Sequence, residues 1–177
     1  GNAYAQTNLG VIYRQGRGGL PQRDAMAVEW DRKAADQGNA RAQSNLGLMY
    51  REGRGGLPQS DALAVEWYRK AADQGYATAQ HNLAVMYEDG RGGLPQSDAL
   101  AAEWYRKAAD QGDAHAEFNL GGAYAKGQGV PRNFPEALRW LRKAHAQGFE
   151  QAAGAIEVVL QAQREQQQGT AAEASTS

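Results

Sequence analysis

One phrase occurs four times along this chain of 177 residues, and it constrains the fold more than any other feature. Its tryptophans lie 37, 37 and 36 residues apart, at Trp30, Trp67, Trp104 and Trp140. A fixed period of this length is typical of a stacked array, in which each unit contacts mainly its neighbours. We therefore predict four units over residues 1–37, 38–74, 75–111 and 112–147, followed by a capping helix over 148–168.

Each unit is predicted to contain two helices. In the second unit, apolar residues recur at three- and four-residue steps from Ala40 to about Arg51, which predicts a first helix, named helix A. A loop rich in glycine and proline follows. Ser60 is then expected to cap a second helix, named helix B, which runs to about Asp73.

Small and large residues alternate in a way that predicts close helix packing. Small residues recur in helix A at Gly10, Gly47, Ala84 and Gly121, and in helix B at Ala27, Ala64, Ala101 and Ala137. The recurrent aromatic residues would fill the space between pairs, as structural core rather than as a cofactor site. We expect Trp67 and Trp104, in interior units, to be largely buried.

Composition excludes several classes of function. The net charge is −1 and the isoelectric point is about 6.4, so no global field attracts nucleic acid or an anionic membrane. The chain has no cysteine, which excludes disulfides, cysteine-ligated zinc and a thiol nucleophile. No apolar run approaches the length of a membrane span.

No residue pattern predicts catalysis, a cofactor or a metal. The Gly-Arg-Gly-Gly loops are not phosphate-binding loops, because no strand precedes them and no Gly-Lys-Ser/Thr follows. His81 and His115, with Glu88 and Glu117 nearby, lack a ligand motif of definite spacing. The row of Arg17, Arg54 and Arg91 is either a small ridge for an anionic contact or solvated surface.

Two strings carry a family resemblance: Ala-x-x-x-Leu-Gly-x-x-Tyr-x-x-Gly in helix A, and Ala-x-x-Trp-Tyr-x-Lys-Ala-Ala-x-x-Gly in helix B. The chain resembles the Sel-one-like repeat (SLR) family, an offshoot of the tetratricopeptide class. The resemblance implies an all-α, right-handed α/α superhelical solenoid, with helix A on the concave side and helix B on the convex side. Family members typically serve as adaptors and scaffolds, often in bacterial systems.

The sequence departs from the family pattern at three points. The first three units carry one extra loop glycine. Position 31 is Asp, where the later copies have Tyr68, Tyr105 and Leu141. The cysteine pair that staples some secreted family members is missing.

A predicted binding surface follows from the helix A stripe that points away from the core. The internal copies differ most along this stripe, and some of its residues are apolar, which together indicate a groove for a partner. Isolated apolar surface residues are the alternative interpretation. The residues predicted to contact a partner here are Arg41, Ser44, Leu48, Thr78, His81, Val85, His115 and Phe118.

A row of asparagines borders the same stripe and is identical in all four units: Asn8, Asn45, Asn82 and Asn119. Asparagine is a poor residue for the middle of a helix, so the row needs an explanation. In the tetratricopeptide class that the chain resembles, such an Asn binds the backbone of an extended peptide. The alternative is a hydrogen bond between neighbouring repeats.

Both ends of the chain carry expectations. Residues from Glu150 to about Gln168 read as a last, capping helix A, and residues 169–177 as a loose tail. The chain starts inside the repeat pattern without Met, so we expect it to be part of a longer, bacterial protein, either exported or cytoplasmic.

The sequence therefore predicts a non-enzymatic, monomeric scaffold that binds a partner protein or peptide on its concave surface. One alternative is a nucleic-acid reader built from helical repeats, although the net charge and the absence of a basic inner stripe argue against it. Another is the regulatory or targeting part of a larger enzyme.

Overall fold

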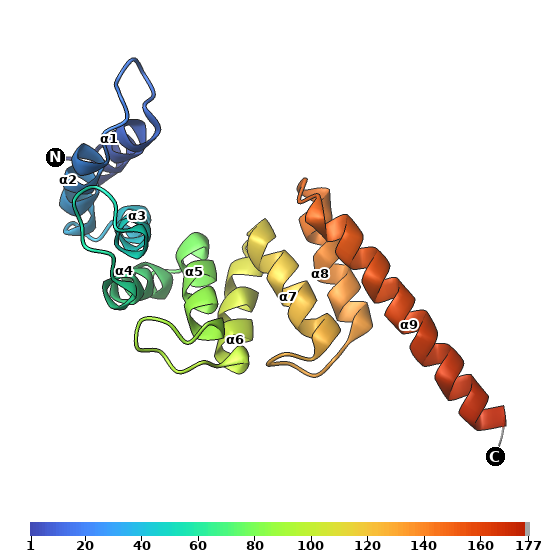
Figure 1. Cartoon of the computed structure of the whole chain (residues 1–177). Helices are drawn as coiled ribbons and strands as arrows, with labels where there is room; N and C mark the ends of the chain where they lie inside the picture. Colours follow the sequence, from blue (N-terminus) through green and yellow to red (C-terminus); the bar gives the residue numbers. More distant parts are fainter. Residues whose placement is uncertain (176–177) are drawn as a thin grey trace. The chain divides into compact units, whose positions relative to one another are not determined.

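The computed structural model describes the backbone of residues 1–175 and the side chains of residues 1–169. This part of the chain contains no strand and nine α-helices, labelled in Figure 1. Their bounds are α1 Ala3–Gln15, α2 Asp24–Ala35, α3 Ala40–Glu52, α4 Asp61–Asp73, α5 Ala77–Glu88, α6 Asp98–Ala109, α7 Ala114–Lys126, α8 Phe134–Ala146 and α9 Gln151–Ser175. The predicted all-helical fold is confirmed.

The helices form two compact units, Gly1–Ser97 with α1 to α5 and Asp98–Ser177 with α6 to α9. In the first unit α1 packs on α2 and α3 on α4, while α2 also contacts α3 and α4 contacts α5. In the second unit α7 packs on α8, and α6 and α9 contact this pair from either end. Helix A thus packs on its own helix B in the pairs α1–α2, α3–α4 and α7–α8, and each of α2, α4, α6 and α8 also contacts the helix A that follows it.

Local caps set the helix boundaries near the positions that the sequence predicts. The side chain of Asn39 accepts a hydrogen bond from the backbone N of Ala42 at 3.0 Å and begins α3. Gly53 ends α3 in the left-handed conformation, with φ of 63°. Ser60 caps α4 as expected, accepting from the N of Leu63 at 3.3 Å.

Tyrosines, rather than tryptophans, fill the centre of the interior repeats. Tyr68 is 0% exposed and Tyr105 2%, whereas Trp67 and Trp104 are only partly buried. The expectation that these two tryptophans are largely buried was therefore wrong. The physical reason is that the side chains of adjacent helical residues point about 100° apart. Because the tyrosine lies at the centre of the buried side of helix B, the tryptophan just before it lies at the edge of that side.

The helix A glycines explain how this tyrosine fits. A Cβ atom on Gly47 would lie 2.6 Å from the ring of Tyr68, a separation at which the ring would have to move. The small residue thus lets α3 approach α4 closely, as the recurrence of small residues predicts. The tryptophan instead packs against the lysine that lies one helical turn later. The Nζ of Lys70 lies 4.3 Å from the ring centre of Trp67.

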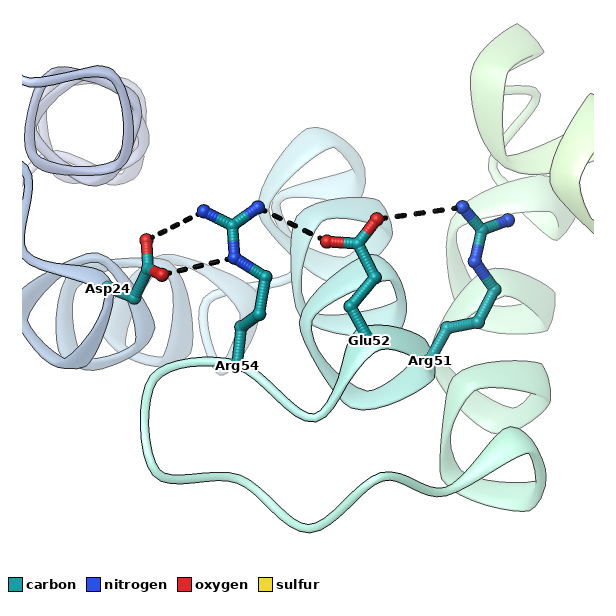
Figure 2. Close-up of polar contacts among 4 residues, drawn as sticks. All are labelled: Asp24, Arg51, Glu52 and Arg54. Carbon is teal, nitrogen blue, oxygen red and sulfur yellow. Dashed lines mark hydrogen bonds and ion pairs between the residues drawn. The ribbon is translucent and has the colours of Figure 1, made fainter.

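Ion pairs of Arg54 and Arg91 join the loops of the second and third repeats to the helix B of the repeat before. Figure 2 shows Arg54 donating to both carboxylate oxygens of Asp24, and each N–O distance is 3.0 Å. The third nitrogen of its guanidinium group lies 3.2 Å from a carboxylate oxygen of Glu52. Arg91 donates to both carboxylate oxygens of Asp61 in the same way, with N–O distances of 2.9 and 3.0 Å. These hydrogen bonds raise the pKa of both guanidinium groups. Arg54 and Arg91 therefore tie repeats together and do not form a free ridge for an anion.

A close backbone approach accompanies each of these ion pairs. Gly55 has φ of +67°, and a Cβ atom there would lie 2.7 Å from the carbonyl oxygen of Asp24 and 2.6 Å from Val28. Gly92 meets the carbonyl of Asp61 in the same way, at 2.5 Å. The loop glycine is therefore required both by its left-handed backbone and by the space available.

The last helix is longer than predicted. α9 continues to Ser175, past Gln168 where the sequence indicated an end. The segment after Gly169 is rich in alanine and has no proline, and alanine is the strongest helix former. Residues 176–177 of the predicted loose tail lie outside the described residues. No helix in the described chain is both long and apolar enough to cross a membrane.

Candidate functional site

The predicted contact residues differ in their access to solvent. We use the name helix-A face for the side of α1, α3, α5 and α7 that carries these residues. Arg41, Thr78 and His115 are exposed there, while four others are partly exposed, namely Leu48, His81, Val85 and Phe118. The two compact units each carry part of this face, α1, α3 and α5 in the first and α7 in the second.

Ser44 does not belong to this face. It is only 4% exposed, as is the equivalent Thr7 at 2%, so the prediction of an accessible Ser44 was wrong. Both side chains at this position are short, and both are buried. A larger residue reaches outward from the same position, as the partly exposed His81 does.

The asparagine row makes different contacts in different repeats. Asn8 is exposed, and its Oδ1 accepts a hydrogen bond from the Nη1 of Arg41 at 3.4 Å. Asn45 is partly buried and donates from Nδ2 to the Oδ1 of Asp31 at 3.1 Å. Both contacts join the first repeat to the second, which matches the structural interpretation of the row at these two positions. Asn82 and Asn119 are partly exposed.

A hollow of about 270 Å³ opens on the helix-A face of the first unit. We name it the helix-A hollow. Its walls come from α1, from the start of α3 and from the residue preceding α5: Tyr4, Thr7, Asn8, Asn39, Ala40, Arg41 and Tyr76. Tyr4 is 77% exposed and Arg41 is also exposed, so the aromatic ring and the guanidinium are available to a ligand.

Tyr76 is a residue that the sequence reasoning missed. It occupies the N-cap position of α5 but makes no side-chain capping hydrogen bond, although Asn39 and Asp113 both do so at the equivalent positions. This exchange of a capping side chain for an aromatic one was readable in the sequence. It places a ring at the edge of the hollow instead.

In the second unit an aromatic ring of the chain itself packs against two residues of the helix-A face. Phe149, just before α9, lies with its ring centre 4.9 Å from that of Phe118 and 5.0 Å from that of His115. Such ring pairs add to the stability gained from burial. The structure thus brings His115 and Phe118 together, beneath a third aromatic residue.

A buried acid lies behind the helix-A face of the first unit. Asp31 is 0% exposed; its Oδ1 is bound to Asn45, and its Oδ2 has no hydrogen-bond partner. Burial raises the pKa of this carboxyl to about 6, against the smaller opposing effects of the Asn45 hydrogen bond and of the charges of Arg14 and Arg41. Gly10 leaves the space, since a Cβ atom there would lie 2.7 Å from Asp31.

Other chemistry finds no support in the described residues. None of their His, Asp and Glu side chains gather in a group of three that could hold a metal ion. Glu117 is buried and accepts from Gln147 at 2.8 Å; burial raises its pKa, and the hydrogen bond lowers it. This glutamate links a helix A to the end of the following helix B, a structural role.

Comparison with known families gives a match to the Sel1 repeat, in four consecutive copies over residues 3–39, 40–76, 77–113 and 114–149. These copies follow the observed helix pairs α1–α2, α3–α4, α5–α6 and α7–α8. No curated protein matches the chain significantly.

Solved structures show the same fold. A protective antigen of uropathogenic Escherichia coli strains, which displays an SLR fold, is 42% identical over 84% of this chain, with a TM-score of 0.76. A Sel1 repeat protein from Oxalobacter formigenes is 35% identical over 88% of this chain, with a TM-score of 0.75. The chain spans 31% and 63% of the lengths of these two proteins. Helicobacter pylori cysteine rich protein B shares the fold at 23% identity, with 73% of this chain and 91% of that chain covered and a TM-score of 0.57.

Proposed function

Because the chain belongs to the Sel1 repeat family, we propose that it is a scaffold that binds a partner polypeptide along its helix-A faces and has no catalytic activity of its own. Sel1 repeat proteins generally act as protein-interaction scaffolds. The helix-A faces are the proposed contact surface, and the asparagines Asn8, Asn82 and Asn119 are proposed to help hold the partner backbone.

The main support is where the internal copies differ. The loop and helix B segments 53–75 and 90–112 differ at one position only, Val65 against Ala102. The corresponding A helices α3 and α5 differ at several positions, including the exposed Arg41 and Thr78 and the partly exposed Leu48 and Val85. Variation is thus concentrated where side chains face solvent on helix A, as expected of a surface that fits a particular partner.

The amide chemistry of the asparagine row fits a polypeptide ligand. A side-chain amide offers both a donor and an acceptor, as a peptide bond does. Asn82 is partly exposed, so it is accessible to such a partner. Asn45 already binds Asp31 and is proposed to tie repeats together rather than to bind the ligand.

The test compares two charge-altered variants of the intact protein in a quantitative pull-down read by mass spectrometry. Arg41→Glu with Thr78→Glu changes exposed side chains of the helix-A face. Glu66→Arg with Glu29→Arg changes exposed side chains of α4 and α2, both B helices. We expect the first variant to lose, at least tenfold, proteins that the wild type and the second variant recover.

Loss of the same proteins from the helix B variant alone would contradict the proposal. Equal recovery by all three proteins would also contradict it, provided that circular dichroism shows unchanged helix content. Retention on heparin that falls with salt would instead favour the nucleic-acid alternative.

A further inference from the structure

The helix-A hollow presents hydrogen-bond donors to solvent. Arg41 donates from Nη1 to the Oδ1 of Asn8 at 3.4 Å. A guanidinium group has no acceptor atom, so the amide oxygen must be the atom of Asn8 that faces it. The NH₂ group of Asn8 therefore points away from Arg41, and both exposed side chains have donors left to offer a ligand.

The positive charge in the hollow is not neutralised by an exposed acid. Arg54 and Arg91 each grip an aspartate, but none of the ion pairs in the described part of the chain involves Arg41. Asp31 acts on Arg41 electrostatically, but it is fully buried and its Oδ1 accepts from Asn45. A ligand in the hollow therefore meets a guanidinium group that is bound only by an amide.

Two tyrosines complete the walls. Tyr4 is 77% exposed, although large apolar rings are usually more covered. Tyr76 takes the place of a capping Asn or Asp and lines the hollow instead. Rings of this kind contact methylene groups through their faces and offer a hydroxyl donor at the rim.

We propose that the helix-A hollow binds an acidic side chain, Asp or Glu, of the partner polypeptide. Arg41 and the Asn8 amide would donate to the carboxylate, and the rings of Tyr4 and Tyr76 would flank its methylene carbons. The volume of about 270 Å³ is below the usual range for a whole small-molecule ligand and suits one side chain. This inference rests on the proposed function and names the chemistry that one part of the surface recognises.

The test uses acetyl-tetraglutamate amide as the probe, titrated into the whole 177-residue protein and followed by ¹⁵N NMR. The Nε signal of Arg41 and the side-chain amide signal of Asn8 should shift and saturate, and the shifts should weaken as salt is added. Acetyl-tetraglutamine amide, which has the same shape without charge, should bind at least about tenfold more weakly, given the strength of charge-assisted hydrogen bonds.

Two variants separate binding from folding. Arg41→Gln should reduce affinity for the probe at least about tenfold, while Arg69→Gln, an exposed arginine of helix B, should leave it unchanged. Tyr76→Asn restores a capping residue, so it should raise the melting temperature and still weaken probe binding severalfold. A merely structural tyrosine would not give these opposite effects.

Equal responses to the glutamate and glutamine probes would overturn the inference. So would binding only of tetra-alanine with a free carboxyl terminus, because the hollow would then recognise a chain end. If the probe fails but Arg41→Glu with Thr78→Glu still loses the partner, the carboxylate inference falls and the scaffold proposal stands.

Discussion

A single buried carboxyl makes the first repeat sensitive to pH. Burial raises the pKa of the Asp31 carboxyl from its usual 3.8 to about 6 in the folded chain, because it disfavours the charged form. The folded chain therefore holds this proton at pH values where the unfolded chain has lost it. Its contribution to stability is fully present below pH 3.8 and is lost as the pH rises through about 6, and it amounts to about 2–3 kcal/mol.

Asp31→Asn tests this dependence. The variant should be more stable than wild type by about 2–3 kcal/mol at pH 7.5 and nearly equal to it at pH 3.5, as measured by urea denaturation at both pH values. The exposed Asp36→Asn serves as control and should change stability by less than about 0.5 kcal/mol. A difference between Asp31→Asn and wild type that stays constant with pH would contradict the assignment.

The tyrosine of the interior repeat should matter more than the tryptophan beside it. Tyr68→Ala should lower the free energy of unfolding by about 3–5 kcal/mol, as is usual for a buried aromatic side chain. Trp67→Ala should have a smaller effect, because Trp67 is only partly buried. Chemical denaturation of both variants measures this, and a larger loss from Trp67→Ala would show that the faces are misassigned.

Removing only the hydroxyl of Tyr68 gives the matched control. The oxygen is buried without a hydrogen-bond partner, and burial raises the pKa of Tyr68 to about 12. Tyr68→Phe keeps the ring and removes an unpaired polar atom, so it should be neutral or stabilising by up to about 1 kcal/mol.

At the residue scale, the sequence predicts where a residue lies along its helix better than it predicts how exposed the side chain is. The repeat period placed the small Gly47 correctly against helix B, because a spacing is fixed by packing. It could not rank Trp67 against Tyr68, since both are aromatic and adjacent. Nor could it show that Ser44 is buried, because that depends on what packs around its short side chain.

At the element scale, two adjacent loop glycines allow the cost of a left-handed backbone to be measured apart from the cost of a close contact. Gly55 and Gly56 both have positive φ, but a Cβ atom on Gly55 would strike the carbonyl of Asp24, whereas Gly56 has open space. Both alanine substitutions carry the left-handed penalty of about 1–2 kcal/mol. Gly55→Ala should lose a further 1–3 kcal/mol, roughly, from overpacking. Equal thermal midpoints for the two variants would remove the evidence for this contact.

The clamp of Arg54 on Asp24 should contribute modestly to the docking of neighbouring repeats. Its side chains are 34% and 26% exposed, so solvent screens the charges, although the bidentate geometry favours them. A double-mutant cycle with Asp24→Asn and Arg54→Gln should give a coupling energy of about 0.5–1 kcal/mol, smaller at high salt. A coupling of zero at low salt would make the contact incidental.

The element boundaries were largely predictable, because local chemistry sets them. Ser60 caps α4, and Gly53 ends α3, as their residue types indicate. The exception is α9, which continues to Ser175. The small polar residues after Gly169 indicate a loose tail, but the alanines among them favour a helix. The row of loop arginines shows a second limit of prediction from sequence. Their spacing of one repeat does not reveal which acidic side chain a guanidinium group binds.

At the scale of the whole molecule, the fold was predictable and part of the candidate site was not. Four copies of one phrase specify helix pairs and their order, and four Sel1 repeats follow. The helix-A hollow depends on Tyr4, Arg41 and Tyr76, which are far apart in sequence and converge only when α1, α3 and α5 stack. The contact of Phe149 with Phe118 also depends on the turn into α9.

Site-specific photo-crosslinking in cells tests directly whether the partner lies on the helix-A face, without knowledge of the partner. A photoreactive phenylalanine is placed at Thr78 on α5 in one variant and at Glu66 on α4 in another, both of which are exposed positions of the first unit. A partner on the helix-A face should give a discrete crosslinked species from position 78 that Arg41→Glu diminishes, and none from position 66. A crosslink that forms only from position 66 would contradict it.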